Sequence, residues 1–129
     1  MAKLTLILQK ETMAVCRLSS QDEVPAWVLK EPFYCVAHTA DELSIILRQE
    51  RVPAEWKAER DWRIFKILGP LDFNLIGILA SIANPLALAS IPINALSTYD
   101  TDYFMVRAWE LEQTCKVLEF EGFKLEREK

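Results

Sequence analysis

The sequence predicts an α+β protein of two ferredoxin-like units in tandem, with antiparallel sheets and helices on one face. Three observations lead to this fold class. The chain has 129 residues, which suits one domain or two very small ones. Its second half alternates strand and helix patterns in the order β-α-β-β-α-β. The most polar stretch, residues 49–61, separates that half from a strand-rich first half, so we expect units at residues 1–59 and 60–129.

The first unit contains clear strand patterns and weaker helical ones. Residues 4–18 hold two apolar runs around the polar tetrapeptide QKET, which predicts a strand, a turn and a second strand. Asp22 is placed to cap a short helix, with Pro25 in its first turn. Residues 31–39 are rich in β-formers, and residues 44–48 form a further strand pattern. The first unit is therefore expected to be a copy of the second with reduced helices.

The second unit shows cleaner periodicity. Residues 61–69 alternate as a half-buried strand does, and a Gly-Pro pair then ends the strand. Asp72 or Asn74 is expected to cap the following helix, in which apolar residues recur every three or four positions. Pro85 falls inside this pattern and should kink the helix. The remaining elements are expected to be strands at 91–98 and 102–108, a helix at 109–120 and a closing strand at 122–126.

The composition excludes several functional classes. The chain is 51% hydrophobic and 26% charged, as folded soluble proteins are, and its net charge of −4 argues against a nucleic-acid surface. The longest apolar run, residues 75–93, contains two prolines and an asparagine, so we expect a buried helix and the start of a strand, not a membrane span. No secretory signal is evident. The expected location is the cytoplasm.

Cysteine and histidine usage predicts neither a metal site nor a cofactor. The three cysteines, Cys16, Cys35 and Cys115, are odd in number and widely spaced, and His38 is the single histidine. His38 has no evident catalytic partner. The acidic pair Asp100 and Asp102 could share acid–base chemistry, but acids in loops are commonly solvated turn residues. The sequence therefore favours a protein that is not an enzyme, with chemistry at this acidic pair as a weaker alternative.

Two polar segments stand out beside apolar ones. The stretch GPLDFNLIG, residues 69–77, connects a strand to a helix start, where unpaired N–H groups and the positive end of the helix dipole attract carboxylates. In the inferred topology this loop lies beside the next strand, whose far end is the polar hairpin STYDTD, residues 97–102. A helix cap and a hairpin turn would explain each segment separately. A small-molecule site would explain both together.

The segment GPLDFNLIGILASIANPLALASIPINALSTYDTDYFMV resembles the ACT-domain signature of the CASTOR family of cytosolic arginine sensors and of their small bacterial relatives. The pattern is a loop with Phe-x-x-x-Gly-Ile, then PLA and Ile, then ST-x-x-TD-x-x-x-V, and it covers residues 62–108. The segment FYCVAHTADELSIIL is similar to a strand of the first ACT unit of that family. This resemblance implies an amino-acid sensor with the ligand held at an interface between units or subunits.

The resemblance also implies the residues of the site. Gly77 would allow close approach of a ligand carboxylate, and Asp102 would pair with an ammonium or a side-chain cation. Leu75 stands where the sensors have an acidic residue, so a smaller or less polar amino acid than arginine is expected. The implied ligand-binding positions are Asp72, Phe73, Asn74, Leu75, Ile76, Gly77, Ile78, Thr98, Tyr99, Thr101 and Asp102.

The expected partners follow from the same reading. They are an amino acid or related metabolite, a second copy in a homodimer and an effector protein, with no nucleic acid and no membrane. An alternative function remains open. A pair of ACT-like units that has lost its ligand would act as a dimerisation or interaction module.

Overall fold

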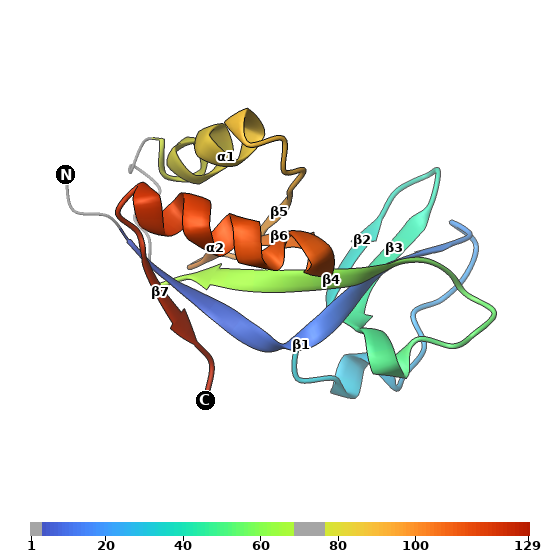
Figure 1. The fold of residues 1–129 in the computed structure, drawn as a ribbon. Helices are drawn as coiled ribbons and strands as arrows, with labels where there is room; N and C mark the ends of the chain where they lie inside the picture. Colours follow the sequence, from blue (N-terminus) through green and yellow to red (C-terminus); the bar gives the residue numbers. More distant parts are fainter. Residues whose placement is uncertain (1–3, 69–76) are drawn as a thin grey trace. The chain divides into compact units, whose positions relative to one another are not determined.

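The computed structural model describes residues 4–68 and 77–129, and its contacts divide the chain into two compact units (Figure 1). The N-terminal unit is Glu11–Trp62. The C-terminal unit combines the residues up to Lys10 with Arg63–Lys129. Two long strands, β1 (Thr5–Leu18) and β4 (Lys57–Ile67), contribute residues to both units.

The C-terminal unit has the β-α-β-β-α-β order. After β4 come α1 (Ile78–Leu88), β5 (Asn94–Ser97), β6 (Asp102–Arg107), the 3₁₀ turn η3 (Ala108–Glu110), α2 (Leu111–Phe120) and β7 (Lys124–Arg127). Its strands are ordered β7-β1-β4-β6-β5, and α1 and α2 lie on the same face of this sheet (Figure 1). The unit is thus the expected α+β fold with two helices on an antiparallel sheet.

One strand pair departs from the antiparallel pattern. β7 pairs with β1 in parallel, with Thr5 opposite Lys124 and Leu8 opposite Arg127. The first half of β1 therefore lies between β7 and β4. In a four-stranded ferredoxin-like sheet, β7 and β4 would be the last and the first strand and would pair directly with each other. The sheet of this unit gains a strand that the sequence pattern of residues 60–129 alone does not contain.

The core of the C-terminal unit lies between the sheet and the two helices. Phe65 and Phe104 stack with their ring centroids 4.8 Å apart, and both are fully buried. Alternate residues of the strands reach this layer because successive side chains of a strand point to opposite faces. The buried cluster consists of Leu6, Leu8, Phe65, Ile67, Ile82, Leu86, Ile91, Phe104, Val106, Leu118 and Phe123.

The sheet of the N-terminal unit is covered by different segments from that of the C-terminal unit. Its strands are ordered β2 (Cys35–His38), β3 (Leu43–Arg48), β1 and β4. The helical segments of residues 11–62, all of which are described, are two three-residue 3₁₀ turns, η1 (Val28–Lys30) and η2 (Gln49–Arg51). The core cluster contains Ala14, Cys16, Val28, Leu43, Ile45 and Leu47. Loop residues, not α-helices, complete this core.

The turn predicted at QKET is wrong. Residues 9–12 lie inside the continuous strand β1. The stretch is polar because Lys10 and Glu11 are exposed, while its backbone stays paired: the Lys10 N–H donates to the Glu128 carboxylate at 2.8 Å. Because this tetrapeptide contains no Gly, Pro or Asn, no residue in it favours a turn over a solvated strand.

The prediction that Asp22 caps a short helix is also wrong. The Asp22 carboxylate accepts the Ser19 N–H at 2.9 Å in a turn, and the 3₁₀ segment begins later, at Val28, whose N–H donates to the Pro25 carbonyl. Asp22 satisfies the backbone locally, as short acidic side chains do in turns. The other predicted strands and helices of the described residues are present within a few residues of their expected bounds.

Candidate functional site

The β5–β6 hairpin brings two of its polar side chains together across the strands. Ser97 lies opposite Asp102 in the antiparallel register, and its hydroxyl donates to Oδ1 of Asp102 at 2.5 Å. Asp102 has the same strand parity as Phe104 and Val106, which belong to the core beneath the helices. Its half-buried carboxylate therefore lies on the helix-covered face of the sheet, at the end of the hairpin.

The threonines at the hairpin tip bond mainly to each other. The Thr98 N–H donates to the Thr101 carbonyl at 2.8 Å, and the Thr101 N–H donates to the Thr98 hydroxyl oxygen at 3.2 Å. These contacts hold the turn closed, as hydroxyl side chains often do. Tyr99 is 81% exposed and Asp100 is exposed. Of the four predicted hairpin positions, Asp102 is the one with a carboxylate, and that carboxylate accepts the Ser97 hydroxyl.

The start of α1 has no side-chain cap among the described residues. Gly77 is the N-cap residue, with φ 80° and ψ 10°, and α1 has no side-chain cap. The Gly77 carbonyl accepts the Ser81 N–H at 2.8 Å, which closes the first helical turn. The first N–H groups of a helix have no partner within the helix, so this end attracts negative charge.

Gly77 has a conformational role. A positive φ of 80° strains any residue with a Cβ atom, and a Cβ built on Gly77 meets no atom within 4 Å. Close packing of α1 on the sheet is therefore not the reason for this glycine. Ile78, the next residue, is half-buried and packs against the core cluster, so its side chain serves the fold.

The topology places the hairpin tip and the start of α1 at the same end of the unit. β4 runs toward this end, α1 starts there and runs away, β5 returns, and the hairpin turns before β6 leaves (Figure 1). The predicted positions Asp72, Phe73, Asn74, Leu75 and Ile76 lie outside the described residues. Gly77, Ile78 and the four hairpin positions are the part of the predicted site that the structure describes.

The structure also describes the surroundings of the other residues that the sequence singled out, His38 and the cysteines. The exposed His38 has its Nε2 2.9 Å from the Ser20 carbonyl oxygen. Burial raises the pKa of the Cys16 thiol to about 11 and also raises the pKa of Cys115, so both thiols hold their protons. Within residues 4–68 and 77–129, no group of three or more His, Cys, Asp or Glu side chains is placed to hold a metal ion.

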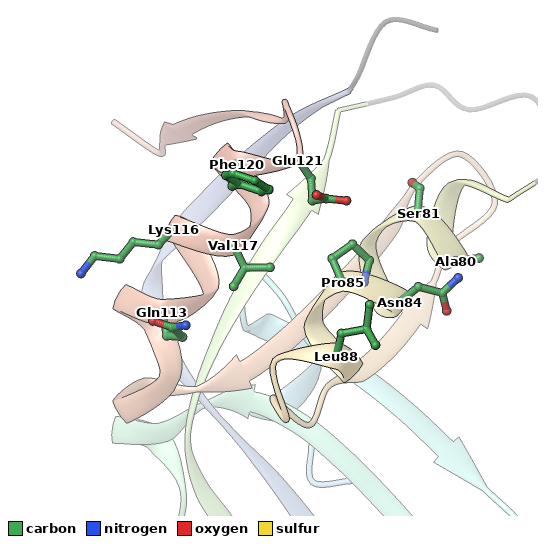
Figure 2. Close-up of a pocket in the computed structure, with 10 residues that line it drawn as sticks. All are labelled: Ala80, Ser81, Asn84, Pro85, Leu88, Gln113, Lys116, Val117, Phe120 and Glu121. Atoms are coloured by element: carbon green, nitrogen blue, oxygen red, sulfur yellow. The ribbon is translucent and has the colours of Figure 1, made fainter.

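Sequence reasoning missed a groove between α1 and α2. It has a volume of about 590 Å³ and is lined by five residues of α1, four of α2 and Glu121, which follows α2 directly; Leu88 and Phe120 are among them (Figure 2). The sequence contained one indication of this groove: the exposed face of α1 carries no charged residue. The three- and four-residue periodicity identified the buried face of α1, but it gives no information about the opposite, exposed face.

Comparisons with known proteins agree with this architecture. A family model described as an ACT domain matches residues 57–119. Protein Atu0741 from Agobacterium tumefaciens is 32% identical, with a TM-score of 0.92, and the alignment covers 100% of this chain and 96% of that one. The chain belongs to the family of Atu0741 and carries an ACT domain at residues 57–119. A second model, described as an N-terminal domain, matches residues 11–55.

More distant structures share the fold of this ACT protein. A Vibrio cholerae protein of unknown function, VC0802, described as a possible transport protein, is 16% identical with a TM-score of 0.74, over 93% of this chain and 91% of that chain. The regulatory subunit of aspartate kinase from Thermus flavus is 11% identical with a TM-score of 0.64, over 94% and 99% of the two chains. No curated protein matches the sequence significantly. No helix among the described residues of the ACT protein is long and apolar enough to cross a membrane.

Proposed function

We propose that this ACT protein is a cytoplasmic, non-enzymatic sensor that binds an amino acid and reports it to an effector protein. It would consist of two ACT units in tandem, at residues 1–59 and 60–129, and would be a small bacterial relative of the CASTOR arginine sensors. The ACT match and the fold shared with a regulatory subunit of aspartate kinase support a regulatory role. The observation that carries the binding proposal is the start of α1 behind Gly77, which no side chain of the described residues caps, at the hairpin end that bears Asp102.

The two polar elements suit the two charged ends of an amino acid. The ligand carboxylate would accept hydrogen bonds from the N–H groups at the start of α1, where a Cβ on Gly77 would meet open space. The ligand ammonium would pair with Asp102, whose Oδ1 also accepts the Ser97 hydroxyl. Thr98, Tyr99 and Thr101 would border the ligand, and Asp72–Ile78 would complete the site.

The side chain of the ligand is expected to be small or weakly polar. Leu75 offers no charge to a guanidinium, and burying a guanidinium without a second carboxylate would leave its charge uncompensated. The branched-chain and other apolar amino acids are thus preferred over arginine.

A thermal-shift screen against the standard amino acids tests this proposal. A ligand that binds only the folded state stabilises it by about 2.7 kcal/mol at a concentration 100 times Kd, which raises the melting temperature by several degrees. We expect such a shift with an L-amino acid and none with its D-enantiomer. Calorimetric titration would then give the affinity. The absence of a shift with every amino acid would contradict the sensor.

The alternative function is a ligand-free interaction module that pairs with a second copy. It is favoured by the hydrogen bonds that Thr98 and Thr101 already make and by the packing of Ile78 into the core. A dimer that responds to no amino acid is the result expected for this module. We prefer the sensor because a hairpin closed by its own hydrogen bonds does not account for a helix start at the same end of the unit that no described side chain caps.

A further inference from the structure

A small cavity lies between α2 and the strands at the β7 side of the sheet of the C-terminal unit. We call it the α2–β7 cavity; its volume is about 220 Å³, and Leu8, Phe65 and Leu125 form the apolar part of its lining. One water molecule takes up about 30 Å³ of liquid, whereas drug-sized ligands occupy cavities of roughly 300–1,000 Å³. The α2–β7 cavity therefore has the size for a small metabolite.

Arg127 lines this cavity from β7, on the helix-covered side of the sheet. In the parallel register Arg127 lies opposite Leu8, which belongs to the buried cluster, and paired residues of neighbouring strands share a face. Leu125, two residues earlier on β7, packs against the same cluster. An inward-pointing charge on an edge strand can serve merely to prevent edge-to-edge pairing. That role does not require an acidic residue across the cavity, and α2 supplies one.

Glu119 lines the cavity from α2, one helical turn after Cys115. Among the described residues, neither the Glu119 carboxylate nor the Arg127 guanidinium has a partner in an ion pair or a hydrogen bond. Glu126, the other acid of the lining, is already paired with Lys124 at 3.1 Å. One positive and one negative side chain thus line the same cavity without neutralising each other.

A second guanidinium lies near the thiol of Cys115. Arg63 comes two residues before Phe65 on β4, so it is on the same face of the strand. Its Nη2 donates to a backbone carbonyl of β1 at 3.1 Å, but its Nε is buried and has no hydrogen-bond partner in the described part of the chain. Burial raises the pKa of the Cys115 thiol, and the charges of Arg127, Glu119 and Arg63 also act on it. These three charged groups therefore lie close to one another.

We propose that the α2–β7 cavity binds a small zwitterion, an amino acid or a related carboxylate that bears an amine. The ligand carboxylate would bind Arg127, and the ligand ammonium would bind Glu119. A ligand with a negative charge alone would be repelled by Glu119, and one with a positive charge alone would be repelled by the guanidiniums. An apolar side chain of the ligand would pack on Leu8, Phe65 and Leu125. The cavity shares no residue with the proposed site at the start of α1.

Cys115 can report whether the cavity is occupied, because its half-buried thiol lines the cavity. We would measure its alkylation by iodoacetamide, by peptide mass spectrometry, with each standard L-amino acid at millimolar concentration. We expect an apolar amino acid to slow alkylation of Cys115 several-fold and to leave Cys35 unaffected, since Cys35 is half-buried in the N-terminal unit.

Analogues that lack one charge test the zwitterion. If leucine protects Cys115, isocaproate and isoamylamine, which lack its ammonium and its carboxylate, should not protect it. For another protecting amino acid, its deaminated acid and its decarboxylated amine are the corresponding probes. Protection by no amino acid, or equal protection by either analogue, would overturn the proposal.

Variants assign the charged contacts. Glu119→Gln and Arg127→Gln should each weaken protection of Cys115 roughly 10-fold or more in ligand concentration, each compared with the same variant without ligand. Glu126→Gln is the matched control and should leave it nearly unchanged, because Glu126 lines the cavity but is paired with Lys124. Thermal melts would establish that each variant is folded. Equal effects of Glu119→Gln and Glu126→Gln would overturn the assignment.

Asp102→Ala separates this cavity from the proposed sensor site. Protection that survives Asp102→Ala and is lost in Glu119→Gln supports the α2–β7 cavity, whatever the outcome at the start of α1. Protection that is lost in Asp102→Ala and survives in Glu119→Gln assigns the ligand to the start of α1, and it overturns this proposal while supporting the sensor.

Discussion

The two units bury their sheets by different means. In the C-terminal unit, α1 and α2 cover one face of the sheet, and eleven buried residues pack between helices and strands. In the N-terminal unit, side chains from loops and 3₁₀ turns complete the core. Trp27 stacks on Trp56 with the ring centroids 5.7 Å apart, and Arg51 lies over the Trp27 ring. The helix start that can bind an anion therefore exists in one unit only among the described residues. The comparison separates a unit covered by helices from one covered by loops, Glu11–Trp62, which we call the support unit.

The support unit also contains a buried ion pair. The Glu31 carboxylate accepts Arg48 Nε at 2.8 Å and Nη2 at 3.1 Å, and its side chain is 4% exposed. Hydrogen bonds from Arg48 lower the pKa of Glu31. This pair joins the residue after η1 to the end of β3.

The largest effect is expected in the helix-covered core. Phe104→Ala removes the ring that stacks on Phe65 and leaves a cavity beneath the helices, so the free energy of unfolding should fall by about 3–5 kcal/mol. Leu47→Ala, equally buried in the N-terminal unit, should cost about 2–5 kcal/mol. Urea denaturation measures both. A loss below about 1 kcal/mol for Phe104→Ala would mean that the helices do not depend on this stack.

The next effect concerns ligand binding in the C-terminal unit. Asp102→Ala should weaken binding by about 1.5–3 kcal/mol, because a charge-assisted bond to the ligand is lost. Asp100→Ala is the matched control, since Asp100 is exposed in the turn and Asp102 is half-buried on the helix-covered face. Calorimetric titration compares the two variants. Equal losses would remove the assignment of the ammonium to Asp102.

A smaller effect should follow from the backbone of Gly77. Gly77→Val places a β-branched residue at φ 80° and should lower stability by about 1–2 kcal/mol, in addition to blocking the carboxylate subsite. Gly77→Asn is the control, since asparagine tolerates this conformation better. Thermal melts and titrations on both variants separate strain from binding. A Gly77→Val variant with normal affinity would show that the helix start holds no ligand.

The smallest effect is expected in the support unit. Glu31→Gln keeps one hydrogen bond to Arg48 but loses the charge, at a cost of about 1 kcal/mol near neutral pH. Because the pKa of Glu31 is lowered below 4.5 by folding, its stabilisation is complete above pH 4.5 and is lost as the pH falls through the folded pKa. Unfolding free energies measured between neutral and acidic pH should converge for the two proteins. A constant difference at all pH values would contradict this linkage.

The sequence predicted most of the C-terminal unit because its signals are local. Three- and four-residue spacing indicated α1 and α2, and the polar STYDTD segment between two strand patterns indicated the hairpin. The helix cap was expected at Asp72 or Asn74, which lie outside the described residues. Gly77 is the N-cap of α1, in a conformation that hydrophobic periodicity does not encode.

The features that were not predicted depend on residues far apart in the chain. Glu31 and Arg48 meet only after β3 folds back, and nothing in the spacing of the two residues indicates this pairing. The groove between α1 and α2 forms where these two helices pack side by side, so the sequence of either helix alone does not indicate it. The hairpin positions were predicted by resemblance, while the Ser97–Asp102 contact required the register of β5 on β6.

The parallel pairing of β1 with β7 affects how the protein is made. The ACT match ends at residue 119, before β7, and begins at residue 57, after β1. A fragment cut to the match would lack both strands at one side of the sheet and would expose an unpaired edge on β4, which invites aggregation. During synthesis on a ribosome, the first half of β1 can pair with β7 only after β7 has been translated, so this contact between distant segments forms late. The sheet of the C-terminal unit thus becomes complete only after β7 has been translated.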